Sequence, residues 1–253
     1  MLDLQKASLL KRISAFILDA ILLVIAISGF AFFLSAVTGF NSYSEKLDEI
    51  YTSYEEEYGI SPNLNYDQYD KLSDEEKEIY KNVTEAISKD AEANKAYGMV
   101  INLTLLITSI SILLGYISLE FVVPLIFKNG QTVGKKIFGI ALMRTDGVRI
   151  TAFMLFVRTV LGKYTLETMV PVLIIVMTFF GNAGIIGLAI LVLIGTLQIV
   201  LIFATKTRSC IHDLLACTVA VDMNSQMIFN TPEELLEYKK KLHADITADS
   251  KYM

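Results

Sequence analysis

The stretch KRISAFILDAILLVIAISGF, residues 11–30, opens an apolar run that continues to Val37. At about 1.5 Å per residue, a helix of this length crosses a bilayer core of about 30 Å. Asp19 lies inside the run, although insertion of a carboxylate at the centre of a bilayer costs about 2.5–3.5 kcal/mol. The sequence therefore predicts a membrane-spanning helix whose Asp19 faces polar protein groups or water and not lipid.

Three further windows lack a run of charges, and with the first they predict four transmembrane helices at residues 13–37, 99–127, 164–180 and 185–205. Hydrophobic residues make up 53% of the 253-residue chain, and the mean hydropathy of +0.50 is typical of an integral membrane protein. The first run is longer than the apolar core of a signal peptide, so we expect it to be retained. The predicted fold class is an all-α membrane protein, with a tight turn at residues 181–184 between the last two helices.

The net charge of −5 is divided unevenly along the chain. Residues 41–95 contain 15 acidic residues and 6 lysines, a net charge of −9, whereas the rest contains 12 acidic and 16 basic residues, a net charge of +4. With four spans, twelve basic residues near the span ends fall on one side of the membrane: Lys6, Lys11, Arg12, Lys128, Lys135, Lys136, Arg144, Arg149, Arg158, Lys163, Lys206 and Arg208. By the positive-inside rule that side is cytoplasmic. We therefore expect a multi-pass cell-membrane protein with both termini in the cytoplasm and the acidic segment outside.

This pattern predicts six regions along the chain. They are a cytoplasmic N-terminus and first span (1–37), an extracytoplasmic acidic helical insertion (38–96), a second span (97–127), a basic cytoplasmic or interfacial loop (128–163), a hairpin of the third and fourth spans (164–205), and a cytoplasmic His-Asp segment with a C-terminal tail (206–253). In the insertion, Ser73 and Glu76 form a capping-box pattern that predicts a helix able to continue into the second span. In the loop, Asp146-Gly147 predicts a turn between two short extended pieces.

Three blocks of the sequence resemble motifs of one known family and occur in the same order. They are KRISAFILDAIL at residues 11–22, GQTVGKKIFGIALMRTDGVRITAFMLFVR at residues 130–158, and RSCIHDLLACTVAV at residues 208–221. In this order, and with these apolar spans, the chain resembles the RDD family of bacterial membrane proteins, which is named for an arginine and two aspartates. The resemblance covers residues 6–222 apart from the acidic insertion.

The resemblance places Arg12 and Asp19 on the family's arginine and first aspartate, and His212-Asp213 on its His-Asp pair near the C-terminal end. Cys217 stands where the family pattern predicts glycine. The resemblance implies a fold built from membrane helices. It also implies cation/proton exchange, the role suggested for the family.

Several ionisable side chains are placed at one end of the predicted helices. Arg12 and Asp19 face the same side of a helix, but about 10 Å along its axis separates them, so Asp19 needs a further partner. Lys163 and Glu167 are four residues apart and predict an ion pair along one helix. The candidate ion- or proton-coupling residues are Arg12, Asp19, Glu120, Arg158, Glu167, His212 and Asp213. We expect them to line a polar vestibule open to the cytoplasm, with Asp19 as its deepest charged member.

Two hypotheses for the function stay open at this point. In the first, the protein is a secondary transporter in which Asp19 alternately holds a proton and a monovalent cation, and four spans then favour a homo-oligomer. In the second, the protein is a non-transporting accessory or scaffold protein, Asp19 is permanently paired, and the acidic insertion binds an extracytoplasmic protein partner. For His212-Asp213 the alternatives are a proton relay and an anchor for the C-terminal segment.

Other classes of function find little support in the sequence. Cys210, Cys217 and His212 lack Cys-x-x-Cys spacing, so we expect no metal site, and without a phosphate-binding glycine loop we expect no cofactor. We expect no enzyme, because Cys210 and His212 are two positions apart and lie on different faces of a helix. Orientation explains the positive charge, so the expected surroundings are the lipid bilayer and not a nucleic acid.

Overall fold

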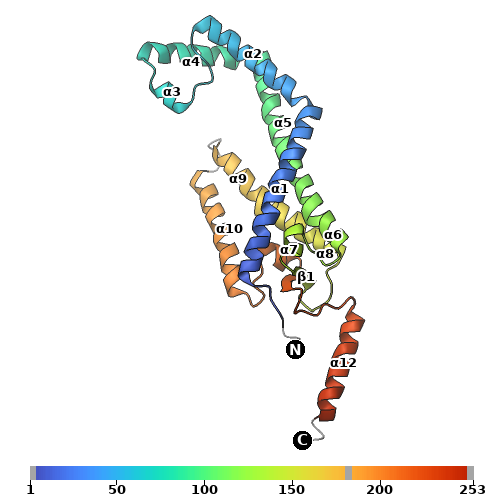
Figure 1. Ribbon diagram of the computed structural model, residues 1–253. Helices are drawn as coiled ribbons and strands as arrows, with labels where there is room; N and C mark the ends of the chain where they lie inside the picture. Colours follow the sequence, from blue (N-terminus) through green and yellow to red (C-terminus); the bar gives the residue numbers. More distant parts are fainter. Residues whose placement is uncertain (1–3, 180–183, 250–253) are drawn as a thin grey trace. The chain divides into compact units, whose positions relative to one another are not determined.

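The computed structural model describes residues 4–179 and 184–249 of the chain (Figure 1). Four helices in this part are long and apolar enough to cross a membrane, and they extend over Leu9–Thr38, Ala91–Phe127, Ala152–Thr178 and Gly184–Ala204. Many of their large apolar side chains, such as Phe32 and Ile185, are exposed on the protein surface, as expected for helices surrounded by lipid. The prediction of a mainly helical fold with four helices that can span a membrane is confirmed.

Two of the four long helices contain π-helical turns. The first is a single α-helix, α1 (Leu9–Thr38), and the last is α10 (Gly184–Ala204). The second consists of α5 (Ala91–Tyr116), η1 (Ile117–Val122) and α6 (Val123–Phe127), and the third of α8 (Ala152–Phe156), η2 (Val157–Met169) and α9 (Val170–Phe179). A π-helix is rare and is frequently found at a functional site, so the parts of the second and third long helices at η1 and η2 are candidates for one.

The third long helix begins at Ala152, well before the predicted start of the third span at residue 164. Thr151 caps it, because its Oγ1 accepts a hydrogen bond from the backbone N–H of Met154 at 3.3 Å. The charges of Arg158 and Lys163, which favoured a loop in the sequence, have partners inside the protein and do not end the helix. The predicted end of this span and most of the predicted turn at residues 181–184 fall on residues 180–183, outside the described part of the chain.

The chain divides into two compact units, of which the first to be described is Ser28–Ser111. Its helices include α2 (Phe40–Tyr58), α3 (Tyr66–Asp70) and α4 (Asp74–Lys89). The predicted capping box is present: the Ser73 N–H donates to Glu76 Oε2 at 2.7 Å, and the Glu76 N–H donates to Ser73 Oγ at 3.3 Å. α4 does not continue into the second span, because Asp90 leaves the helical conformation and its Oδ1 accepts the Glu92 N–H at 2.7 Å, which caps α5.

The other unit consists of Met1–Ile27 and Ile112–Met253 and contains a small sheet. β1 (Ile140–Arg144) pairs antiparallel with β2 (Thr218–Asp222). The predicted turn at Asp146-Gly147 is present, since the Arg144 N–H donates to the Val148 carbonyl at 2.8 Å. The main partner of β1 is nevertheless β2, which was not predicted to be a strand. The β-branched residues of the TVAV run at 218–221 were the available signal.

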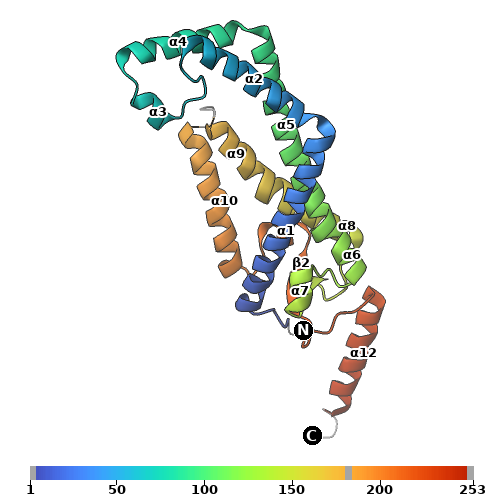
Figure 2. The ribbon, with the colours of Figure 1, turned by 45° about the horizontal axis from the view of Figure 1, so that its top comes forward.

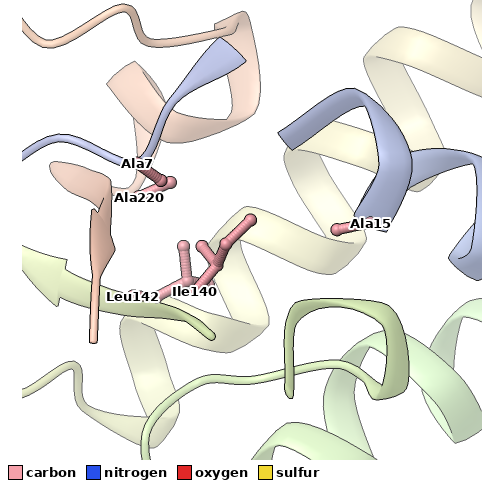
Figure 3. Close-up of a cluster of buried hydrophobic side chains, with 5 residues drawn as sticks. All are labelled: Ala7, Ala15, Ile140, Leu142 and Ala220. Atoms are coloured by element: carbon pink, nitrogen blue, oxygen red, sulfur yellow. The ribbon is translucent and has the colours of Figure 1, made fainter. Parts of the chain in front are cut away.

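The core of this unit lies between the sheet and the beginning of α1. Figure 3 shows Ala7, Ala15, Ile140, Leu142 and Ala220, which are buried together. The remaining helices of the unit are α7 (Val133–Ile137), α11 (Ile211–Leu215) and α12 (Pro232–Asp249). Figures 1 and 2 show α7 beside the sheet, in agreement with its contacts with β1. The small side chain of Ala15 lets α1 approach these elements closely, and this packing positions the charged residues described next.

Candidate functional site

Nine ionisable side chains in the unit that contains the sheet form two groups of ion pairs, which interact through Glu120 and Arg158 and which we together call the ionic network. Its members are Arg12, Asp19, Glu120, Lys135, Arg158, Lys163, Glu167, His212 and Asp213. Their side chains are only 1–16% exposed. The network includes all seven residues that the sequence predicted as coupling candidates, together with Lys135 and Lys163. Four carboxylates balance four cationic side chains, so the network is neutral when His212 is neutral.

Asp19 binds the beginning of α7. Its Oδ1 accepts the Gly134 N–H at 2.8 Å, and its Oδ2 accepts the hydroxyl of Thr132, the N-cap residue of α7. A carboxylate in this position satisfies a backbone N–H that has no partner within the helix. A Cβ atom added at Gly134 would lie 2.4 Å from the carbonyl oxygen of Ala15, so only glycine permits this approach. Asp19 therefore holds α7 against α1.

Lys135 is the centre of one group in the network, which we call the Lys135 site and define as Asp19, Glu120, Thr132 and Lys135. The Lys135 Nζ lies 3.1 Å from Thr132 Oγ1, 3.7 Å from Asp19 Oδ2 and 3.9 Å from Glu120 Oε2. Glu120 Oε1 accepts a hydrogen bond from Lys163 at 2.5 Å, whereas its Oε2 has no hydrogen-bond partner among the described residues. Burial lowers the pKa of Lys135 to about 8, although the nearby carboxylate of Glu120 acts in the opposite direction.

Asp213 is the centre of a second group. Its Oδ1 accepts hydrogen bonds from Arg158 Nε at 3.0 Å and from Thr218 Oγ1 at 3.2 Å. The Nη2 of Arg12 lies 3.6 Å from Asp213 Oδ2. Burial opposes the ionisation of Asp213, but the positive charges around it, first that of Arg158, hold its pKa below the usual range. Arg12 thus pairs with Asp213 and not with Asp19, as expected from the separation of Arg12 and Asp19 along the helix axis.

His212 connects this second group to Glu167. Its Nδ1 lies 2.8 Å from Glu167 Oε2, and its backbone N–H donates to Glu167 Oε1 at 3.0 Å. Burial lowers the pKa of His212, so the imidazole is neutral near pH 7. An ionised carboxylate can only accept, so the proton of this neutral imidazole is on Nδ1, and Nε2 has a free lone pair.

The predicted ion pair between Lys163 and Glu167 is not the one that forms. Lys163 binds Glu120 at 2.5 Å and Glu167 binds His212, because both side chains find buried partners on other elements. Hydrogen bonds in a π-helix join residues five apart, so residues four or five positions apart lie on one face of η2. Arg158, Lys163 and Glu167 have this spacing and all point into the network.

Three residues that form or shape the Lys135 site were not predicted as site residues. Thr132, Gly134 and Lys135 belong to the GQTVGKK run at residues 130–136, whose lysines were predicted only as basic residues near the span ends. A threonine is a preferred helix N-cap, and the backbone N–H groups of the turn that follows it need partners, so this run held a signal for a carboxylate partner. Pairing of charged side chains alone does not reveal such a backbone donor.

The fold and the network together define a class: a multi-pass helical membrane protein with a balanced set of charges buried between its helices. The family model of the RDD family matches residues 6–217, a range that includes every residue of the network. The chain therefore belongs to the RDD family, as its three sequence blocks predicted. Comparisons with curated proteins and with solved structures find no match.

Proposed function

We propose that the protein is a secondary transporter that exchanges a monovalent cation for a proton at the Lys135 site. This proposal assigns the chain a transport role and not an enzymatic one. The observation that supports it is the position of the Lys135 ammonium group, which lies among oxygens of Thr132, Asp19 and Glu120 that come from three different elements.

Oxygens of this kind are the ligands that hard cations prefer in proteins. Two of the three belong to carboxylates, and one of these, Glu120 Oε2, lacks a hydrogen bond. A buried acceptor without a partner is costly, and a cation in contact with it would remove this cost. A monovalent cation that replaced the ammonium charge would therefore find a set of oxygen ligands already assembled.

The exchange conserves charge. Lys135 releases a proton and becomes a neutral amine, the cation enters beside Asp19 and Glu120, and the total charge of the site does not change. The charged groups that face the Lys135 ammonium are the carboxylates of Asp19 and Glu120 and the cations Lys163 and Arg158. The pKa of about 8 keeps the proton on Lys135 near neutral pH while leaving its release accessible.

The proposal also assigns an orientation of the protein in the membrane and an oligomeric state. We assign the end of the helices that bears the ionic network to the cytoplasm of the cell, because most lysines and arginines near the span ends lie there. Both termini are then cytoplasmic, and the acidic segment at residues 38–96 is outside. Four membrane-spanning helices are few for a transporter that works by alternating access, so we propose that the functional protein is a homo-oligomer in the lipid bilayer.

Substitution of Asp19 by asparagine tests this function. In proteoliposomes, a sodium gradient should drive proton movement through the wild type, and Asp19→Asn should reduce this movement to the background level, because an amide supplies no charge to the incoming cation. Asp146→Asn is the matched control, since the exposed Asp146 binds Arg144 outside the network. Size-exclusion profiles establish that each variant is folded.

Wild-type protein that moves neither sodium nor protons would overturn the transport proposal. It would favour the accessory role, in which residues 38–96 bind an extracytoplasmic protein partner. Equal flux through Asp19→Asn and the wild type would overturn the assignment of Asp19 to the site.

A further inference from the structure

A second group of potential ligands lies apart from the Lys135 site, on α11 and at its N-cap. The thiol of Cys210, the imidazole of His212 and the carboxylate of Asp213 have ligand atoms within 4.8 Å of one another. We call these three residues the Cys210 group. We propose that this group binds a zinc ion through Cys210 Sγ, His212 Nε2 and Asp213 Oδ2, and this proposal is independent of the transport function.

The orientation of His212 supports the assignment. His212 Nδ1 lies 2.8 Å from Glu167 Oε2, so Nε2 is the ring nitrogen left for a ligand, and it lies 3.7 Å from Asp213 Oδ2. Both of these atoms are potential zinc ligands. A cation between them would be bound by both, and a carboxylate that holds the remote nitrogen of a ligating histidine is the usual outer partner of a zinc ligand.

The two oxygens of Asp213 have different surroundings. Oδ1 is fully used, by Arg158 at 3.0 Å and Thr218 at 3.2 Å. Oδ2 has only longer contacts, of 3.4 Å to the Cys210 N–H and 3.6 Å to Arg12. Oδ1 therefore fixes the carboxylate, while Oδ2 is available to a ligand.

The set of donor atoms identifies the class of metal. A sulfur, an imidazole nitrogen and a carboxylate oxygen together suit zinc and disfavour magnesium and calcium, which prefer oxygen alone. Three protein ligands leave one position of a tetrahedral ion for water. The local packing is also close, because a Cβ atom added at Gly162 of η2 would lie 2.5 Å from the Cβ of His212. A zinc ion here would fix the first turn of α11, whose His212 and Asp213 already contact Glu167 and Arg158 of η2.

Cobalt binding to the full-length protein in detergent tests this site. Co²⁺ that takes the place of zinc should give a thiolate-to-cobalt absorption band and bind in a ratio of about one ion per chain. Cys210→Ser should abolish the band, whereas Cys217→Ser should retain it, because Cys217 lies outside the group. Glu167→Gln should keep the band at saturation but weaken binding by about 10- to 100-fold. Wild type without a band, or with a band that Cys217→Ser removes, would overturn the proposal.

A second measurement needs no variant. At a pH and reagent concentration at which metal-free Cys210 reacts despite its partial burial, zinc should protect Cys210 of the wild type from alkylation by iodoacetamide while the exposed Cys217 continues to react, and mass spectrometry of the peptides separates the two. Equal alkylation of Cys210 with and without zinc would refute the site even if Cys210→Ser failed to fold.

Discussion

Replacement of Arg158 by methionine is expected to lower the free energy of unfolding by about 3–5 kcal/mol. Arg158 is 3% exposed, and its guanidinium binds Asp213 Oδ1 through Nε and Nη2 at 3.0 Å each. Methionine fills a similar volume but leaves the buried carboxylate of Asp213 with one cation, Arg12, whose Nη2 lies 3.6 Å from Asp213 Oδ2. Circular dichroism during denaturation of the protein in detergent measures the loss.

The double variant Arg158→Met/Asp213→Asn provides the control for this prediction. Asparagine removes the uncompensated charge, so the double variant should be more stable than the sum of the two single losses predicts, by about 0.5–3 kcal/mol. Strict additivity of the two substitutions would contradict the pairing of Arg158 with Asp213.

Substitution of Gly134 by alanine is expected to destabilise the protein by about 2–3 kcal/mol. The added Cβ atom would lie 2.4 Å from the Ala15 carbonyl oxygen and 2.9 Å from Asp19 Cγ. α7 must then move away from α1, and the Gly134 N–H loses its hydrogen bond to Asp19. Chemical denaturation in detergent reports the change.

Gly195 offers a matched control for this prediction. A Cβ atom at this position of α10 meets nothing within 4 Å, so Gly195→Ala should be neutral, or stabilising by up to about 1 kcal/mol through helix propensity. Equal effects of the two substitutions would show that Gly134 is not required for close packing.

Much of the fold was predictable because hydrophobic length is a strong signal in membrane proteins. All four long helices were found from runs without charges, and the capping box at Ser73 was found from its spacing. Helix boundaries were less predictable where charged residues lie inside a helix that continues past them. The charges of Arg158 and Lys163 led to a predicted start of the third span at residue 164, whereas one helix runs from Ala152 through both residues because they have buried partners, which no local pattern reveals.

The members of the site were more predictable than their contacts. The sequence identified seven of the nine ionisable residues from their depth and their place in the family's blocks. It did not show that Lys135 pairs with Asp19, or that Glu167 binds His212, because these contacts join residues far apart in the chain. The π-helical turns of η2 orient Arg158, Lys163 and Glu167 toward the ionic network, and such turns have no reliable signature in sequence.

Proton release on addition of sodium tests the central claim most directly, namely that the Lys135 proton and a transported cation compete for one set of oxygens. Purified protein in weakly buffered detergent at about pH 7 should release close to one proton per chain when sodium chloride is added, and none with choline chloride, since Lys135 is protonated below its pKa of about 8. The release should disappear at about pH 10, where Lys135 is already neutral, and Lys135→Met should release no proton at either pH. Wild type that releases no proton with sodium, or a Lys135→Met variant that releases as much as the wild type, would contradict the account.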